Sequence, residues 1–342
     1  MDGLFGLSRY PIIQAPMAGA QGALLAVGAA RGGALGSLPC AMLTPESLRK
    51  ELETYRSATA EAVNVNFFVH EPPRPDAARE AAWRKLLDPY YRETGIDPAT
   101  VPSGAGRAPF SDEFADALEP FKPEVVSFHF GLPSAKLMAR VKGWGSKVIA
   151  SATTVAEAQW LEAQGVDAVI AQGLEAGGHR GIFLSDDLTT QVGTFALVPQ
   201  VAQAVRVPVI AAGGIADARG MRAALQLGAD AVQVGTSFLL CPESMISAVH
   251  RAALKSDGAR HTALTNLFTG RPARGIVNRL MRELGAMNPG APAFPTATAG
   301  IAPLRAKGEA AGHGDFSPLW SGQNNSACRE VPAAQVVESL LA

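Results

Sequence analysis

The stretch Asp167-Ala-Val-Ile-Ala-Gln-Gly-Leu-Glu-Ala-Gly-Gly-His-Arg-Gly181 decides how the rest of the chain is interpreted. Its first six residues contain two β-branched side chains between alanines, which is typical of a short buried strand. Gln172 ends this strand, and in the loop that follows Gly177 and Gly178 allow a close backbone approach to a ligand. His179 carries the side chain that ordinarily titrates near neutrality. Active sites of α/β barrels lie at the carboxyl ends of the strands. The stretch therefore predicts a barrel strand followed by a catalytic loop. The alternative is a glycine-rich turn with a solvated histidine.

Seven further short apolar runs share the character of this strand, and amphipathic stretches separate most of them. They cover residues 11–17, 33–38, 62–68, 125–130, 147–152, 208–214 and 231–236. Nearly all are apolar throughout rather than alternating, as expected for strands covered on both faces. Eight such strands joined by helices predict an α/β fold, a (β/α)8 TIM barrel.

Two regions break this rhythm and predict a mostly helical cap, partly inserted and partly C-terminal. Residues 69–120 contain a predicted helix near 75–94 and then a Pro/Gly-rich piece, and we expect this excursion to cover one end of the barrel. Residues 242–285 have a helical pattern, whereas 286–327 show little periodicity. The predicted organisation is a barrel over 1–241 with the 69–120 excursion contributing to the cap, a substrate-binding cap over 242–315, and a segment 316–342 that returns to the barrel.

Composition excludes several classes of partner. The chain has 342 residues, of which 47% are hydrophobic and 18% charged, and its formal net charge is −1. This balance predicts a large core and no nucleic-acid or anionic-membrane partner. Three scattered cysteines and the lack of a signal peptide or spanning segment predict a cytoplasmic protein. A homodimer is compatible with the sequence, which does not set the oligomeric state.

The ends of the last two predicted barrel strands have the small residues of a phosphate site. Gly213 and Gly214 follow one strand, and Gly235 and Thr236 follow the other. Barrels commonly bind phosphate there through backbone N–H groups. The alternative is that these glycines only relieve crowding as the barrel closes.

The cofactor expected from these features is FMN. The six histidines do not form a metal-binding pattern, and neither a P-loop nor a Rossmann glycine motif is present, so no metal site is expected. The amides of Asn66 and Gln172 lie at predicted strand ends, where they could bond a ring's edge, and the backbone near Met17 could cover its face.

Five motifs resemble the nitronate monooxygenase family, formerly called 2-nitropropane dioxygenases, and in particular its class I branch. The resemblance covers about residues 10–285, and the run Glu-Ala-Gly-Gly-His-Arg-Gly is its most specific element. The motifs are Gln14-Ala-Pro-Met-Ala-Gly19, Asn64-Val-Asn-Phe-Phe68, Ser127-Phe-His-Phe-Gly-Leu-Pro133, Ala171-Gln-Gly-Leu-Glu-Ala-Gly-Gly-His-Arg-Gly181 and Pro208-Val-Ile-Ala-Ala-Gly-Gly-Ile215.

The resemblance implies an FMN enzyme that oxidises alkyl nitronates with O2 to carbonyl compounds and nitrite. It implies His179 as the active-site histidine beside the flavin and the substrate. His129 would be a second polar group facing the nitronate, although a core histidine satisfied by backbone is the alternative. The residues implied to contact FMN are Met17, Asn66, Ser151, Gln172, Gly177, Gly214, Gln233, Val234, Gly235 and Thr236.

One segment departs from the family's pattern. Many class I members have two tyrosines and a lysine where this chain has Phe294, Thr298 and Ala302. Without the lysine, propionate 3-nitronate is a doubtful substrate, although Arg305 or Lys307 could supply the missing charge.

A later run, Trp320-Ser-Gly-Gln323, resembles a Gly-Gln element near the family's site and suggests Ser321 and Gln323 as further substrate contacts. An ordinary turn is the alternative. Two other functions also stay open: an NAD(P)H-dependent reductase of quinones or enoyl thioesters on the same barrel, and a flavin- or phosphate-binding barrel without turnover.

Overall fold

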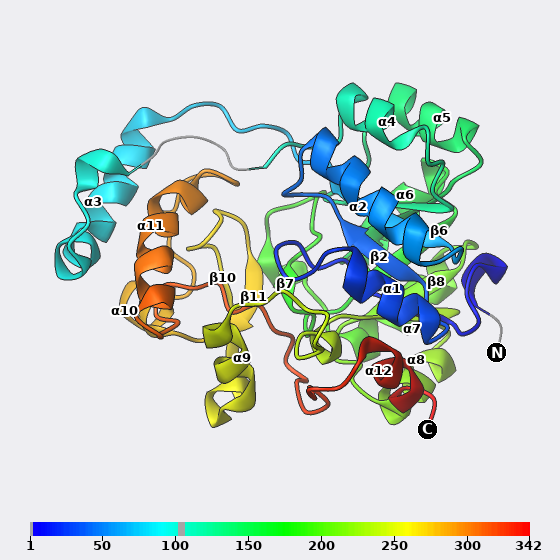
Figure 1. The fold of residues 1–342 in the computed structure, drawn as a ribbon. Helices are drawn as coiled ribbons and strands as arrows, with labels where there is room; N and C mark the ends of the chain where they lie inside the picture. The colour runs from blue at the N-terminus through cyan, green and yellow to red at the C-terminus, as the bar shows by residue number, and fades with distance from the viewer. Residues whose placement is uncertain (1–2, 102–106) are drawn as a thin grey trace.

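The computed structural model describes residues 3–101 and 107–342 and contains a barrel of eight parallel strands (Figure 1). Neighbouring strands follow the order β1-β9-β8-β6-β5-β4-β3-β2, and a parallel bridge between Ile13 and Leu35 links β1 to β2. All eight predicted barrel strands are confirmed. They are β1 (Ile12–Gln14), β2 (Gly36–Pro39), β3 (Val63–Phe68), β4 (Val125–His129), β5 (Lys147–Ala152), β6 (Ala168–Gln172), β8 (Val209–Ala212) and β9 (Ala231–Val234).

The barrel strands are mostly apolar on both faces because the two faces belong to two different cores. In β6, Val169 and Ala171 pack in the large core between strands and helices. Ala168 and Ile170 instead belong to a smaller inner core that also contains Leu4. The alternation of side chains across a strand therefore divides one apolar run between the barrel's interior and its helical coat.

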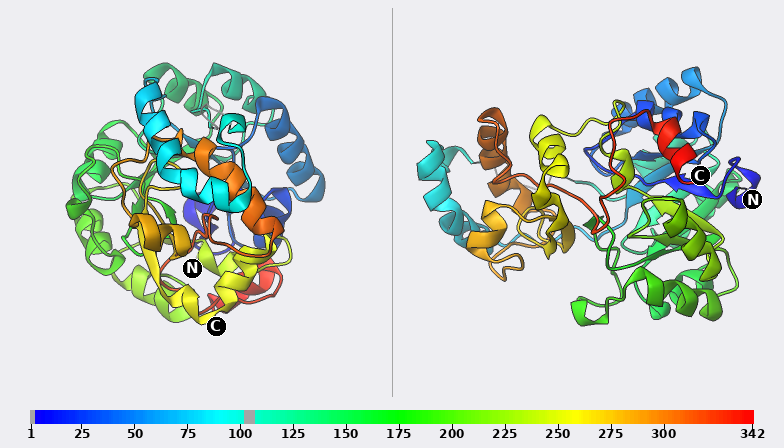
Figure 2. Two further views of the ribbon diagram at one scale, coloured as in Figure 1. Left: turned by 90° about the vertical axis from the view of Figure 1, so that its left-hand side faces the viewer. Right: turned by 90° about the horizontal axis from the view of Figure 1, so that it is seen from below.

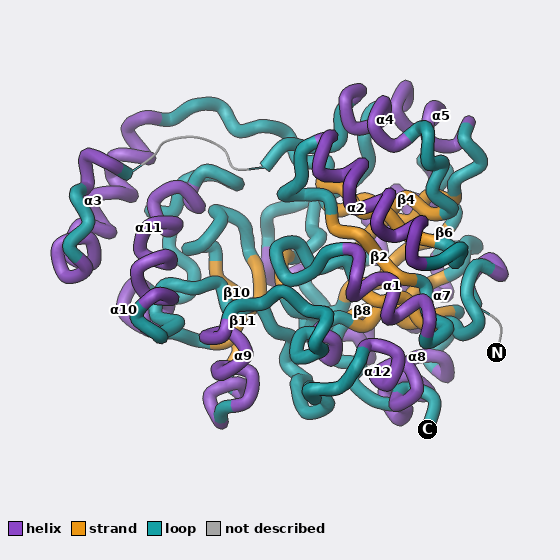
Figure 3. The backbone as a smooth tube through the Cα atoms, viewed as in Figure 1, coloured by secondary structure: helices purple, strands orange, loops and turns teal. Residues whose placement is uncertain are grey.

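Helices form an outer ring around the strands (Figure 3). The C-terminal helix α12 packs against α1, so the end of the chain returns to the barrel. Helix α4 packs against α2 and α5, and thus part of the 69–120 excursion lies in the ring. The ring helices are α1 (Ala23–Arg31), α2 (Pro45–Ala58), α4 (Asp112–Leu118), α5 (Ala135–Gly143), α6 (Val155–Ala163), α7 (Thr194–Ala204), α8 (Ala218–Gln226) and α12 (Ala333–Ser339).

A cap stands over the carboxyl ends of the strands, and α3 and α11 cross the barrel's mouth (Figure 2). These two helices share a second core, in which the Tyr91 hydroxyl donates to the Gly300 carbonyl over 2.6 Å. The cap helices are α3 (Ala77–Thr94), α9 (Ala248–Lys255), α10 (Arg279–Leu284) and α11 (Ala297–Ala310). A small sheet joins β10 (Thr262–Thr265) to β11 (Ala273–Ile276), and β11 to β7 (Gly178–His179). Single 3-10 turns lie at Leu4–Gly6, Pro98–Thr100, Leu188–Thr190, Thr236–Phe238 and Asp257–Arg260.

Two expectations for the cap are wrong. Residues 242–285 are not helical throughout, because β10 and β11 form an antiparallel pair in their middle. The stretch 286–327 contains the 14-residue helix α11. The sequence pattern does not reveal this helix because Pro303 and Gly300 lie inside it. Gly300 is needed for close packing on α3, since a Cβ there would lie 3.1 Å from atoms of Trp83.

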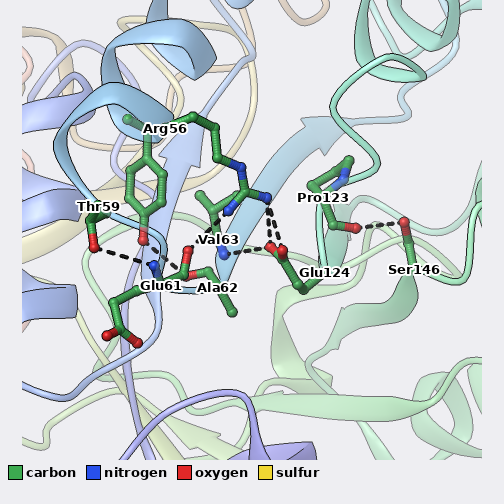
Figure 4. A network of polar contacts seen from close by, with 9 residues as sticks. Arg56, Thr59, Glu61, Ala62, Val63, Pro123, Glu124 and Ser146 are labelled. Carbon is green, nitrogen blue, oxygen red and sulfur yellow. Dashed lines mark hydrogen bonds and ion pairs between the residues drawn. The ribbon is translucent and has the colours of Figure 1, made fainter.

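The amino ends of the strands are joined by polar contacts (Figure 4). The Glu124 carboxylate accepts from Arg56 Nη2 over 2.8 and 2.9 Å and from the Val63 backbone N–H over 3.0 Å. Nearby, the Ser146 hydroxyl donates to the Pro123 carbonyl over 2.6 Å. These bonds tie the start of β3 to the segments that lead into β4 and β5.

Among the helices in the described part of the chain, none is both long enough and apolar enough to cross a membrane.

Candidate active site

A cavity of about 540 Å³ lies between the carboxyl ends of the barrel strands and the cap. Residues from β3, β4, β5 and β6 and from the turns after β1, β8 and β9 form its barrel side. Most residues proposed from the sequence come together there. Those in the cavity wall are Met17, Asn66, His129, Ser151, Gln172, Gly177, Gly178, His179, Gly213, Gly214, Gln233, Gly235, Thr236, Thr298 and Ser321.

Three proposed residues are not in the cavity wall. Val234 is buried in the core between strands and helices, because its side chain points away from the barrel's mouth. Gln323 is exposed; its neighbour Asn324 lines the cavity instead and donates to the Gly214 carbonyl over 2.9 Å. Phe294 packs beside the site, with its ring centroid 5.4 Å from that of His179.

His179 is held by the cap as well as by the barrel. Its strand β7 pairs with β11, so His179 lies opposite Ala273. The imidazole Nε2 lies 3.0 Å from the Thr269 hydroxyl. The His179 carbonyl accepts from the side-chain amide of Gln172 over 3.0 Å, and the Gln172 Oε1 accepts from the Gly181 N–H over 2.8 Å. The loop is thus folded back onto the end of β6, and the second N–H of the Gln172 amide is left for a ligand.

Both ring nitrogens of His129 have partners within the protein. Its Nε2 lies 3.2 Å from the His179 carbonyl, which can only accept, so Nε2 carries the proton. Its Nδ1 therefore accepts from the Ser151 hydroxyl, 3.0 Å away. With both nitrogens engaged by the protein, His129 positions the His179 loop rather than presenting a free nitrogen to substrate.

A buried guanidinium fixes the same loop from the other side. The side chain of Arg180 is fully buried and donates to the Gln172 carbonyl over 2.8 Å and to the Gly173 carbonyl over 2.7 Å. Its Nε donates to Gln191 over 2.9 Å. Such a set of bonds satisfies the buried charge with carbonyl and amide dipoles and sets the path of the chain on either side of His179.

The histidines of this site are neutral at physiological pH. Burial lowers the pKa of His129 to about 3. Burial also lowers the pKa of His179 well below its usual value, and the charges of Arg107 and Arg271 add to the effect. A charged imidazole would lose its hydration and face these cations, so the neutral form prevails.

The glycine-rich ends of β8 and β9 form a suitable cradle for an anionic group. Gly213 and Gly214 have φ values of 111° and 73°, which residues with a Cβ rarely adopt. Within the described residues, the N–H groups of Gly214, Gly235 and Thr236 have no protein acceptor. Convergent free N–H groups at strand ends bind phosphate.

A buried amide nearby also lacks a partner. Gln233 Oε1 lies in the cavity wall and has no hydrogen-bond donor in the described part of the chain. A buried acceptor without a partner is costly unless a ligand supplies a donor. The cradle and this amide together fit a flavin with a phosphate tail.

Gly177 is also required by the packing of the protein itself. A Cβ there would lie 2.5 Å from the Gly322 backbone nitrogen, so the returning C-terminal segment, rather than a ligand, excludes a side chain.

The sequence did not single out several cavity residues that come from the excursion and the cap. They are Arg107, Phe268, Thr269 and Trp320. Of the two cations suggested as replacements for the missing lysine, Arg305 lines the cavity and Lys307 does not. Arg107 follows a Pro/Gly-rich stretch with no periodic pattern, and Thr269 lies between β10 and β11, which the sequence pattern did not reveal. Trp320 stood in the quoted late run, but no feature marked its ring as a site residue.

Comparisons with known proteins agree with this arrangement. A family model described as "Nitronate monooxygenase" matches residues 3–342. The "Nitronate monooxygenase" of Pseudomonas aeruginosa is 41% identical in sequence, and the match covers 99% of this chain and 97% of that protein. The "Nitronate monooxygenase" of Paraburkholderia phytofirmans is 42% identical, and the match covers 98% of this chain and 92% of that protein. The solved structure of a nitroalkane oxidase from Streptomyces ansochromogenes is 38% identical, covers 98% of this chain and 95% of its own, and has a TM-score of 0.89. The chain is therefore an oxidoreductase and belongs to the nitronate monooxygenase family, whose members generally depend on a flavin.

Proposed function

We propose that this chain oxidises alkyl nitronates with O2 to carbonyl compounds and nitrite, with FMN as its cofactor. The observation that carries the proposal is that one cavity contains both His179 and the glycine-rich ends of β8 and β9. The relatives named for nitronate and nitroalkane oxidation support the substrate class. The substrates are thus a small nitronate and O2.

The residues that would hold FMN divide between its phosphate and its ring. The backbone N–H groups of Gly214, Gly235 and Thr236 would bind the phosphate. The side-chain amides of Asn66, Gln172 and Gln233 would bond polar atoms of the ring, which the Met17 segment would cover. FMN, when bound, supplies the chemistry that accepts electrons from the substrate and passes them to O2.

His179 is the residue we propose to contact the nitro group. The Thr269 hydroxyl can donate to Nε2 or accept from it, so the neutral ring is held in place in either tautomer. With its proton on Nδ1, the ring can donate to a nitronate oxygen. With its proton on Nε2, it can take a proton from the carbon of a neutral nitroalkane. The aromatic side chains of Phe68 and Trp320 line the same cavity and exclude water from the reacting atoms.

The proposal is tested by mixing the purified flavoprotein with a preformed alkyl nitronate under argon, and then in air. We expect the flavin absorbance to change under argon and nitrite to accumulate in air. An unchanged spectrum together with no nitrite would rule the function out. Bleaching by NADH or NADPH without any response to nitronate would instead identify the reductase, and a colourless protein would point to a binding barrel.

A further inference from the structure

The cavity wall contains a cation, Arg107, for which the described residues provide no carboxylate partner. We infer that Arg107 binds the negative charge of the substrate and makes the enzyme selective for anionic nitronates over neutral nitroalkanes. This inference rests on the proposed function, and it assigns the recognition of the substrate's charge to Arg107 rather than to the neutral histidines of the site.

Two nitrogens of the Arg107 guanidinium are buried without a hydrogen-bond acceptor among the described residues. It lines the cavity, and its Nε and Nη1 atoms are inaccessible to solvent and have no acceptor among residues 3–101 and 107–342. The five residues before it in the sequence, Pro102-Ser-Gly-Ala-Gly106, include no Asp or Glu. An isolated buried charge is among the most unfavourable features that a folded chain can carry. An unpaired cation in the wall of a ligand cavity is stabilised if the ligand is an anion that serves as its counterion.

Electrostatics place this cation next to His179. The charge of Arg107 is the largest charge effect on the pKa of His179, after burial itself. The two residues also share a neighbour, because Arg107 Cζ lies 5.6 Å from the centroid of the Phe294 ring, which packs on His179. Burial and the charge of Arg305 lower the pKa of Arg107 to about 10, so the guanidinium stays charged at pH 7.

Two other arginines near the cavity differ from Arg107: Arg305 has a carboxylate partner, and Arg271, whose Nε also lacks an acceptor among the described residues, is not part of the cavity wall. Arg305 Nε donates to the Glu309 carboxylate over 2.8 Å, and its side chain is 45% exposed, so its charge is already neutralised and screened. Arg271 donates to the Ile182 carbonyl and lies with its Cζ 4.0 Å above the Phe130 ring. Because the site histidines are neutral, Arg107 is the group best placed to meet an anion beside His179.

The inference predicts that Arg107 acts on binding more than on turnover, and only for charged substrates. A charge-assisted hydrogen bond in a desolvated site changes affinity by about tenfold to a hundredfold. We expect Arg107→Met to raise KM for a nitronate by about this factor with a smaller change in kcat, whereas KM for the corresponding neutral nitroalkane stays within about twofold. Arg107→Lys keeps the charge and should recover part of the affinity.

Two further measurements separate charge recognition from a general structural role. Nitrate serves as an unreactive planar anion, and its dissociation constant, measured by perturbation of the flavin spectrum, should rise about tenfold or more in Arg107→Met. Loss of the positive charge should also raise the pKa of His179 and move the acidic limb of the kcat/KM profile to higher pH. Arg260→Met, which removes an 83% exposed charge from the cap, is the matched control and should change none of these quantities.

The outcomes distinguish this inference from the proposed function. If the wild-type flavoprotein forms no nitrite from any nitronate, the proposed function fails, and the nitrate measurement still decides whether Arg107 binds anions. If nitronates are turned over but Arg107→Met retains its flavin and binds both nitronate and nitrate as the wild type does, the inference is overturned. Flavin content and the circular dichroism spectrum show whether Arg107→Met has folded. If it has not, the test uses Arg107→Lys and Arg107→Gln instead. Unchanged nitrate binding by folded Arg107→Gln would overturn the inference.

Discussion

The carboxylates at the amino ends of the strands and the cavity-lining amide of Gln233 at the carboxyl ends differ in their partners. At the amino ends of the strands, carboxylates accept from backbone N–H groups: Asp167 from Val148 and Asp230 from Val209, each over 2.8 Å. Glu124 makes the third such contact. At the carboxyl ends, Gln233 Oε1 lines the cavity and has no partner in the described part of the chain; the only comparable strand amide among these residues is Asn64, whose Oδ1 lies outside the cavity wall near the start of β3.

This difference separates stability from function. A satisfied hydrogen bond adds to the free energy of unfolding, whereas an unsatisfied buried group lowers it and is tolerated where a ligand will bond it. Changes at the amino ends should therefore lower stability and leave activity alone. Changes at the carboxyl ends should lower activity or flavin binding and leave stability alone or improve it.

The largest effect is expected at the carboxyl end, for His179→Asn. The variant loses the imidazole that contacts the substrate, and we expect kcat/KM for nitronates to fall by at least about a hundredfold. Flavin content and unfolding temperature should stay close to wild type, because the loop is fixed through the His179 carbonyl rather than its ring. His261→Asn alters an exposed side chain in the cap and is the control. Full turnover by folded His179→Asn would show that the ring has no chemical role.

The next effect tests the orphaned amide at the same end. Gln233→Met keeps the length of the side chain and removes its unpaired oxygen. We expect flavin to dissociate about tenfold more readily, while the free energy of unfolding of the flavin-free protein is unchanged or rises by up to about 1 kcal/mol. Titration of the flavin-free protein with FMN and urea unfolding give the two quantities. The exposed Gln226→Met is the control, and a variant that loses stability but binds flavin normally would contradict the comparison.

A smaller effect, of opposite kind, is expected at the amino end. Glu124→Ala leaves the Val63 N–H and the Arg56 guanidinium without their acceptor. The free energy of unfolding should fall by about 1 kcal/mol, and kcat/KM should stay within about twofold of wild type. Glu46→Ala removes an exposed ion pair with Lys50 and should have less than half of this effect. If Glu124→Ala lowered kcat/KM sharply at unchanged stability, the division between the two ends would not hold.

The amino acid sequence predicts the barrel well because the requirement is local. A strand covered by helices on one face and by the inner core on the other is apolar at most positions, and that pattern is visible in β6 or β8 alone. The loop after β6 follows from the same logic, since the carboxyl ends of parallel strands meet at one mouth.

The features that the sequence does not predict depend on contacts between distant segments. β11 pairs with β7, some 95 residues earlier in the chain, and no local pattern announces this. The hydrogen bonds of His129 involve Ser151 and the His179 carbonyl, so its role follows from the folded site alone. Arg107 lines the cavity beside Phe294, a residue far from it in the sequence, and no local pattern predicts that contact.

The smallest effect concerns pH, and it follows from the direction of the histidine shifts. The pKa of His129 is lowered to about 3 and that of His179 well below its usual value, so both rings are already neutral at pH 6 and stay neutral as pH rises. With preformed nitronate, kcat/KM should therefore change by less than about twofold between pH 6 and 8, and should fall only at lower pH, where the rings take up protons. Stopped-flow assays, fast enough to precede reprotonation of the nitronate, measure this profile. A limb centred near pH 6.5 would mean that a histidine titrates with its ordinary pKa, and hence that the ring beside Arg107 is far more hydrated than its burial implies.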